Sequence, residues 1–271
     1  MLYNEHYESH CKLLRIGGVV DELVKMLHLE LEPVGIYLGN AEATCDVLAQ
    51  PGRRNCVVPF LLSAARGKVV GIDEEACTCP GGTVGCCFGD GFTRKNPNIH
   101  KMLSQGLGDA APPDAPIHLV EGERFFCDED TALRWRNSVP FSEAGYPRVV
   151  FAPQSRWSEV GTPDLVLVFA NPDQISALVT MLGFHNGRAV NTLAPFGAAC
   201  HSIVYAAEQM GAEDPLAVMG LFDISQRSEA LAGCLSLTMP FEMWDALAIG
   251  LEKSCLTTHA WHRIEERMPD A

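Results

Sequence analysis

The stretch from Asp164 to Leu182 reads DLVLVFANPDQISALVTML and changes its hydrophobic pattern halfway along. Its opening, DLVLVFA, is an almost continuous apolar run, which is typical of a strand covered on both faces. The next four residues, Asn171 to Gln174, favour a helix start, because they supply a capping asparagine, a proline for the first turn and a glutamine for a capping box. Apolar residues then recur at helical spacing until Gly183, so the stretch predicts a buried strand followed by an amphipathic helix.

The same alternation of strands and helices extends to both sides of this stretch. Short apolar runs bounded by glycine or proline predict further strands, and apolar residues at helical spacing predict further helices. The expected strands are 33–38, 68–72, 118–126, 148–151, 216–222 and 235–239, and the expected helices are 13–28, 56–66, 97–105, 128–136, 200–210 and 240–251. This order predicts an α/β or α+β fold, in which helices cover a mixed sheet.

Two features bear on domain organisation. Residues 110–116 are rich in proline and alanine, which is typical of a linker or seam. Two predicted helices also resemble each other, because Cys56 and Cys200 each open an apolar helix that contains a pair of adjacent alanines. We therefore expect a single domain over residues 1–271, with two similar lobes, 1–110 and 117–271, as the alternative interpretation.

The charge balance excludes several classes of partner. Lys and Arg number 20 and Asp and Glu number 34, which gives a formal net charge of −14. So acidic a chain repels the phosphates of nucleic acids and of anionic membranes. Its apolar runs are shorter than the roughly 20 residues that cross a bilayer, and residues 1–12 lack the apolar core of a secretion signal. We therefore expect a cytoplasmic protein, with no nucleic-acid or membrane partner, that can form a homo-oligomer.

Eleven cysteines are the unusual feature of a chain expected in a reducing compartment. Four of them lie in CTCPGGTVGCCFGDG, residues 77–91, together with five glycines. We expect this segment to be rich in loops, because glycine tolerates tight turns. The peptide N–H groups of Gly81 and Gly82 can then approach anionic sulfur, and such hydrogen bonds stabilise a metal cluster and tune its potential.

The spacing of these cysteines favours an iron–sulfur cluster over a single zinc ion. Cys86 and Cys87 are adjacent, so their side chains point to opposite sides of an extended backbone and do not both bind one metal. The chain also lacks the Cys-x-x-Cys spacing of zinc knuckles. Cys56 and Cys200 are expected at helix N-termini, where the macrodipole favours thiolate. The leading metal ligands are Cys56, Cys79, Cys87 and Cys200, with Cys77 and Cys86 as reserves.

Histidines and the remaining cysteines give weaker indications. His201, next to Cys200, is a candidate for cofactor binding alongside Gly81 and Gly82, because it could hydrogen-bond a cluster sulfur or donate a proton. The alternative for His201 is an ordinary histidine at a helix start. The scattered cysteines are expected to be ordinary thiols, and the two histidine pairs near the termini are expected at the surface. These residues are Cys11, Cys45, Cys127, Cys234, Cys255, His6, His10, His259 and His262.

Several steps of the sequence, taken in order, resemble a known family. They are Glu32-Pro33-Val34-Gly35, Arg54-Asn55-Cys56 before a helix ending Ala64-Ala65-Arg66-Gly67-Lys68, Cys79-Pro80-Gly81-Gly82, and Pro195-Phe196-Gly197-Ala198-Ala199-Cys200. As a set, they resemble the uncharacterised prokaryotic family known as domain of unknown function 169, over roughly residues 20–255. The resemblance implies matching positions for Cys56, Cys79 and Cys200 and occurrence in anaerobes, with no settled activity. Where members often have a glycine–cysteine–arginine step before the last strand, residues 222–227 of this chain contain the arginine but not the cysteine.

These observations leave three functions open. The first is a cysteine-ligated iron–sulfur protein of anaerobic metabolism, in which the cluster transfers electrons to a redox partner or binds a small-molecule substrate at an open iron. The second is a structural or binding module stabilised by zinc. The third is a cysteine-dependent enzyme without metal, in which Cys56 or Cys200 is the nucleophile and a base such as His201 assists it.

Overall fold

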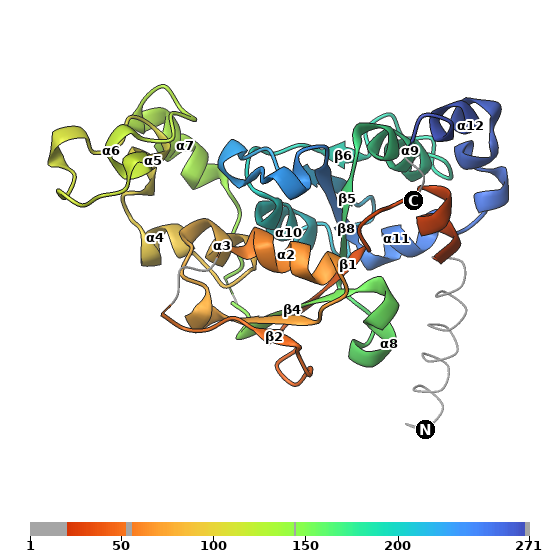
Figure 1. Ribbon diagram of the computed structural model, residues 1–271, viewed down its shortest axis with the longest axis horizontal. Coiled ribbons are helices and arrows are strands. Elements are labelled where there is room, and N and C mark those ends of the chain that lie inside the picture. The colour runs from red at the N-terminus through yellow and green to blue at the C-terminus, as the bar shows by residue number, and fades with distance from the viewer. Residues whose placement is uncertain (1–20, 53–55, 144, 269–271) are drawn as a thin grey trace.

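Eight strands form one continuous mixed sheet in the computed structural model, which describes residues 21–52, 56–143 and 145–268 (Figure 1). The strands lie in the order β2-β3-β4-β1-β5-β8-β7-β6. Their bounds are β1 Val34–Leu38, β2 Val47–Leu48, β3 Val70–Asp73, β4 Arg148–Pro153, β5 Leu165–Ala170, β6 Thr192–Leu193, β7 Ala217–Gly220 and β8 Leu235–Pro240. The predicted mixed sheet is therefore confirmed, and each edge strand is only two residues long, which limits pairing with other chains.

The sheet consists of two halves with the same topology. In the first half β2 is parallel to β3, and β3, β4 and β1 pair antiparallel in turn. In the second half β6 is parallel to β7, and β7, β8 and β5 pair antiparallel in turn. The halves join at the centre of the sheet, where β1 pairs antiparallel with β5. Along the chain, the first half ends with β4 and the second begins with β5.

Helices cover both faces of the sheet. Those on one face are α2 Val57–Ala65, α3 Pro80–Gly85 and α10 Ala199–Ala207, and those on the other are α9 Pro172–Leu182, α11 Phe241–Leu247 and α12 His259–Glu265, together with the helical residues 21–26. Strand alternation separates the two cores, because Val34 and Ile36 of β1 face α2 and α10, whereas Tyr37 faces the opposite layer. The predicted helix over 13–28 is present in its described part, and residues 13–20 lie outside the described residues.

The resemblance between the two cysteine-led helices reflects the repeated topology. α2 and α10 occupy the same place in their halves, between the parallel strands β2 and β3 or β6 and β7. Each helix has nine residues, and the alanine pairs 64–65 and 206–207 form its last two positions. The sulfur positions differ, since Cys56 caps α2 whereas Cys200 is the second residue of α10.

The strand and helix predicted over 164–182 are β5 and α9. All six residues of β5 are buried, as expected for a central strand with helices on both faces. Asn171 caps α9, and a capping box with Gln174 is formed, with nitrogen–oxygen distances of 3.0 and 2.8 Å. Gln174 also donates to the carbonyl oxygens of Leu27 and His28 at 3.0 and 2.7 Å, so the cap fixes residues 21–28 on this face.

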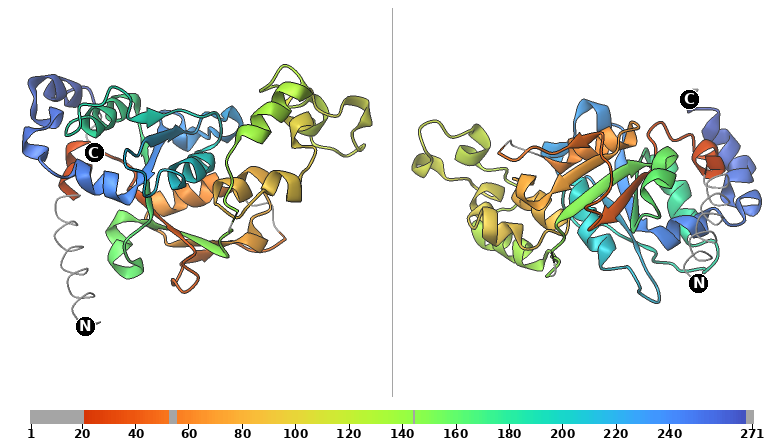
Figure 2. Two further views of the ribbon diagram at one scale, coloured as in Figure 1. Left: turned by 180° about the vertical axis from the view of Figure 1, so that it is seen from behind. Right: turned by 90° about the horizontal axis from the view of Figure 1, so that it is seen from below.

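An insertion between β3 and β4 forms one end of the molecule, and α12 lies at the opposite end (Figure 2). Its α-helices are α3, α4 Gly91–Lys95, α5 Ile99–Leu103, α6 Ile117–Glu121 and α7 Glu129–Ser138, and α8 Trp157–Val160 follows β4. Residues 77–91 contain loops on both sides of α3, a helix that the sequence did not predict. One expectation for the insertion is wrong. The strand expected over 118–126 is replaced by α6, because Pro116 and Gly122 bound a short helix and no neighbouring strand is available.

The other predicted elements are present, with ends shifted by a few residues. The helix expected over 97–105 is α5, that over 128–136 is α7, and that over 240–251 is α11. Residues 111–116 form an irregular segment that is mostly exposed. β3 precedes this segment in the chain and β4 follows it, and the two strands are neighbours in the sheet. The lobe boundary expected at this segment stays a prediction.

Candidate functional site

A cavity of about 720 Å³ lies between the starts of α2, α3 and α10 on one side and α4, α5 and α7 of the insertion on the other. Cys56, Cys79, Gly81 and His201 line it from the three helix starts. The insertion supplies aromatic and aliphatic side chains opposite them. The cavity therefore joins segments that lie far apart in the chain and that the sequence analysis connected only through their cysteines.

The glycines of α3 allow the three helix starts to come together. A methyl group added to Gly82 would lie 2.8 Å from Val57 Cγ2 of α2, and one added to Gly85 would lie 2.5 Å from the carbonyl oxygen of Cys200 in α10. Both distances are shorter than side chains tolerate, so only glycine permits this packing. The glycine-rich segment is thus the contact surface of a short helix, a use that the sequence analysis did not foresee.

Two thiols line the cavity and make hydrogen bonds there. Cys56 Sγ donates to Gln226 Oε1 at 2.8 Å. Cys79 is the N-cap residue of α3, and its Sγ accepts a hydrogen bond from the Gly82 N–H at 3.4 Å. This bond places one of the predicted glycine N–H groups against sulfur.

Three more thiols are buried and do not line the cavity. Cys77, Cys86 and Cys200 are buried in the same core as α2 and α10. Cys77 Sγ accepts a hydrogen bond from Thr83 Oγ1 at 3.7 Å. The five thiols therefore come from three segments. Cys56, Cys79 and Cys200 stand at the starts of α2, α3 and α10, Cys77 lies two residues before Cys79, and Cys86 stands at the C-terminal end of α3.

Burial is the main influence on the pKa of Cys56, Cys86 and Cys200. It raises the pKa of Cys56 to about 11, and the charges of Cys79 and Cys77 are among the smaller contributions. Burial also raises the pKa of Cys86 and of Cys200 well above the ordinary thiol value, and charges on neighbouring thiols add to the increase for both. Cys77 and Cys79 contribute to the raised pKa of all three of these thiols. Without a compensating cation, the neutral thiol form prevails at neutral pH.

Cys87 faces a different part of the molecule. Its backbone has φ of 59°, and its side chain packs with Val84 and Phe92 in the core of the insertion. Burial raises the pKa of Cys87 to about 12, and the only charge that adds to this increase is that of Glu208. Cys86 packs in the core with α2 and α10 and Cys87 in the core of the insertion, although their backbone is not extended and the charge of Cys87 is among those that raise the pKa of Cys86.

The thiols form no disulfide among the described residues. Nor does any set of three His, Cys, Asp or Glu side chains in residues 21–52, 56–143 and 145–268 have the close arrangement that holds a single metal ion. The gathering of thiols is thus looser than a tetrahedral zinc site, in which each sulfur lies about 2.3 Å from the metal.

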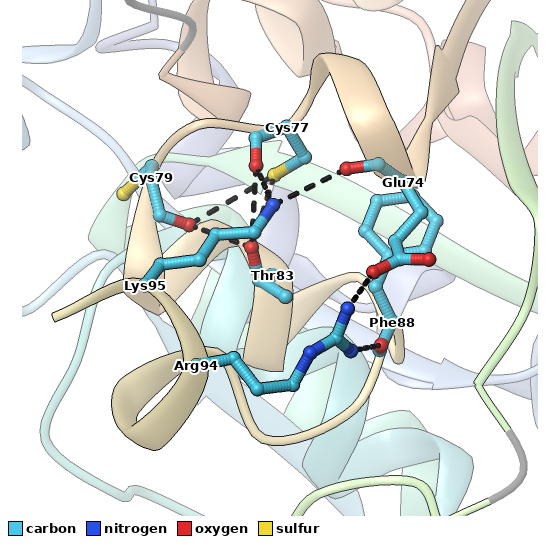
Figure 3. Close-up of polar contacts among 7 residues, drawn as sticks. All are labelled: Glu74, Cys77, Cys79, Thr83, Phe88, Arg94 and Lys95. Atoms are coloured by element: carbon cyan, nitrogen blue, oxygen red, sulfur yellow. Dashed lines mark hydrogen bonds and ion pairs between the residues drawn. The ribbon is translucent and has the colours of Figure 1, made fainter. Parts of the chain in front are cut away.

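Two basic residues hold the loop that carries Cys77 and Cys79 (Figure 3). Lys95 Nζ donates to the carbonyl oxygens of Glu74 and Cys77. Arg94 forms an ion pair with the Glu74 carboxylate and donates to the Phe88 carbonyl at 3.0 Å. Both side chains come from the last turn of α4, so the insertion fixes the position of the cysteine loop.

His201 is buried beneath the cavity with neither ring nitrogen hydrogen-bonded. The side chain lies against Gly81, where an added methyl group would be 3.1 Å from Nε2, and against Gly197. Burial alone lowers the pKa of His201 to about 4, so the ring is neutral at neutral pH. The sequence analysis named His201, and the glycines on both sides of its ring explain why the backbone can approach it so closely.

The remaining candidates lie elsewhere. Cys45, Cys127, Cys234 and Cys255 are not among the residues that line the cavity. His262 Nδ1 bonds Glu265 at 2.7 Å on an exposed surface, which fits the expected surface position. His6, His10 and Cys11 lie outside the described residues, as do Arg54 and Asn55 of the step before Cys56.

A comparison with family models matches residues 22–249 to the uncharacterised family DUF169, described as uncharacterised ArCR. The chain belongs to this family. No curated protein and no solved structure matches the DUF169 chain in the corresponding comparisons. Within the part of the chain that the structure describes, none of the helices combines the length and the apolar composition needed to span a bilayer.

Proposed function

We propose that this DUF169 protein binds a cysteine-ligated iron–sulfur cluster at the starts of α2, α3 and α10. The observation that carries the proposal is the gathering of five thiols from three distant segments beside one cavity. Iron–sulfur clusters in proteins are held by cysteine thiolates, and soft sulfur ligands favour such metals. The ligands would come from Cys56, Cys77, Cys79, Cys86 and Cys200.

The chemistry of the surrounding residues fits this cofactor. The thiols are buried away from solvent, and burial raises the pKa of Cys56 and Cys200 above the ordinary value, so their thiolate forms need a compensating cation. The iron of a cluster supplies that charge. A hydrogen bond such as that from the Gly82 N–H to Cys79 Sγ is of the kind that tunes a cluster's potential.

A cluster suits the thiol arrangement better than a single zinc ion does. A tetrahedral ion needs its donors in one close shell, and no three donors among the described residues stand that way. A cluster spreads its thiolates over several iron atoms and therefore accepts wider spacing. This argument ranks the two metal hypotheses, and the measurement of metal content decides between them.

When bound, the cluster would supply one-electron transfer with a redox partner or an open iron for a small-molecule substrate. The residues of this chain would hold the cluster, exclude water and admit the substrate through the cavity. The two thiols that line the cavity, Cys56 and Cys79, are the ligands nearest to an incoming molecule. A reducing compartment such as the cytoplasm would keep all five thiols available.

Purification of the full chain without oxygen tests the proposal. We expect a brown protein with matched amounts of iron and sulfide and a visible absorption that bleaches on reduction. C56S and C79S should each lose at least half of the iron, while C127S and C255S, in which the replaced thiol lies away from the cavity, should keep it. Circular dichroism checks that each variant folds.

Two results would overturn the proposal. A colourless protein with one zinc ion would support the structural zinc module. A metal-free protein in which a single thiol reacts far faster than the others would support the cysteine-dependent enzyme.

A further inference from the structure

The wall of the cavity opposite the thiols is aromatic. Phe92, Phe125, Trp135 and Phe196 all line it. The ring of Trp135 lies 5.7 Å from the rings of both Phe92 and Phe196, centroid to centroid, and Phe125 lies 5.3 Å from Phe196. Rings from α4, α7 and two loops thus form one continuous surface, which is suited to an apolar or cationic group.

The cavity also carries an excess of negative charge. Glu123 and Asp223 both line it, and neither forms an ion pair within the described ranges. The one Lys or Arg side chain in the described lining, Lys95, donates to two backbone carbonyls. Burial, followed by the charge of Asp223, raises the pKa of the Glu123 carboxyl, and His118 opposes that increase. The two carboxylates therefore repel each other across the cavity.

A third observation is independent of these charges. His201 lines the cavity, is 8% exposed, and has no hydrogen-bond partner at either ring nitrogen. Buried polar atoms without partners are rare and costly, so such atoms indicate a group that the protein binds. Phe92 and Trp135 flank the ring at 6.1 and 5.9 Å between centroids, so the aromatic wall of the cavity continues onto His201.

We infer that the cavity binds a small organic ammonium ion. Its apolar body would lie against the aromatic wall, and its charge would relieve the repulsion between Glu123 and Asp223. Its N–H groups can donate hydrogen bonds to the two carboxylates. The formal net charge of −14 attracts a cation from solution and repels an anion. The inference depends on the cavity alone and holds with or without a cluster.

Isothermal titration calorimetry of the full chain, purified without oxygen, tests the inference with three probes of similar size. They are benzylammonium, benzyl alcohol and benzoate at neutral pH, which carry positive, zero and negative charge on the same ring. We expect benzylammonium to bind at least tenfold more tightly than benzyl alcohol and benzoate not to bind. Equal affinity for benzylammonium and benzyl alcohol, tighter binding of benzoate, or no binding of any probe would overturn the inference.

Variants locate the charge that recognises the probe. E123Q and D223N keep the size of the side chain and one oxygen acceptor but remove the charge, and each should weaken benzylammonium binding about fivefold to tenfold without changing that of benzyl alcohol. E121Q is the matched control, because Glu121 is exposed and does not line the cavity. Unchanged affinity in both E123Q and D223N would reject the site.

The measurement is separable from the test of the cluster. A metal-free protein that binds benzylammonium through Glu123 and Asp223 would reject the proposed cluster and support this inference. A protein that carries iron and sulfide but discriminates none of the three probes would do the reverse.

Discussion

Cys56 Sγ donates a hydrogen bond to Gln226 Oε1 at 2.8 Å, although 170 residues separate the two in sequence. Gln226 belongs to a short 3₁₀ helix, Ile224–Gln226, that lies between β7 and β8 in the second half of the sheet. Cys56 caps α2 in the first half. The bond therefore ties the two similar halves together at the edge of the cavity.

The amide of Gln226 should control the reactivity of Cys56. A carboxylate there opposes thiolate formation, so Q226E should slow alkylation of Cys56 by iodoacetamide about tenfold, which corresponds to about one unit of thiol pKa. Q226A removes the acceptor that holds the S–H proton and should speed the reaction. Mass spectrometry of metal-free protein, prepared with a chelator, measures the rate at Cys56, with Cys255 as the internal control. A change in the same direction for both variants would contradict this role.

Gly85 should tolerate no side chain. A methyl group there would lie 2.5 Å from the carbonyl oxygen of Cys200, so α3 and α10 would have to separate. We expect G85A to lower the free energy of unfolding in urea by about 1–3 kcal/mol, even though alanine is the better helix former. G233A is the control, because no heavy atom lies within 4 Å of an added methyl group there, and its stability should change by less than about 0.5 kcal/mol.

The cap of α9 should contribute measurably to stability. Asn171 Oδ1 accepts from the Gln174 N–H at 3.0 Å, and N171A should lower the free energy of unfolding by about 1 kcal/mol. Asn98 also stands at a helix N-cap but makes no capping hydrogen bond with its side chain. N98A is therefore the matched control, and an equal loss in the two variants would show that the capping bond contributes nothing.

Asp164 should make stability depend on pH. Burial raises the pKa of its carboxyl and Glu242 adds to this, while the bond from the Leu38 N–H at 2.7 Å opposes it. Because the folded-state pKa is raised, the group favours folding below its unfolded pKa, and this contribution is lost as pH rises through the folded value. D164N keeps an oxygen acceptor without the charge. Its stability relative to wild type should rise between about pH 3 and about pH 7, by less than about 1 kcal/mol because solvent screens the carboxyl.

Urea unfolding of D164N and wild type at both pH values checks this prediction. D114N, at an exposed position in the segment 111–116, controls for general effects of losing one negative charge. A relative stability of D164N that falls with rising pH would show that the ionised carboxylate is favourable in the folded chain.

The sequence predicted the elements whose local pattern and burial agree. β5 and α9 were predictable because a wholly buried strand is wholly apolar and because the capping residues stand in fixed order. α6 was missed because residues 118–126 contain apolar residues that would suit a strand, but their place in the insertion offers no strand to pair with. α3 was missed because glycine has poor helix propensity, and its glycines are explained only by the close contacts of α3 with α2 and α10.

The sequence predicted only those residues of the candidate site whose side-chain type suggests metal or proton chemistry. Cys56, Cys79 and His201 stood out by residue type, and the structure brings them to one cavity. Glu123 and Asp223 did not stand out, because an exposed carboxylate and one that faces a cavity look alike in sequence. Their relation depends on the fold of the insertion against the second half of the sheet, which no local pattern encodes.

The antiparallel pairing of β1 with β5 has a consequence for how the chain holds together. A polypeptide with only one of the two units would leave the paired residues of β1 or β5 without a partner strand, and it would need a second molecule to complete the sheet. Covalent connection of the units replaces that encounter with an intramolecular one, so dilution cannot separate them. The thiols contributed by both units then stay together at any concentration at which the protein occurs.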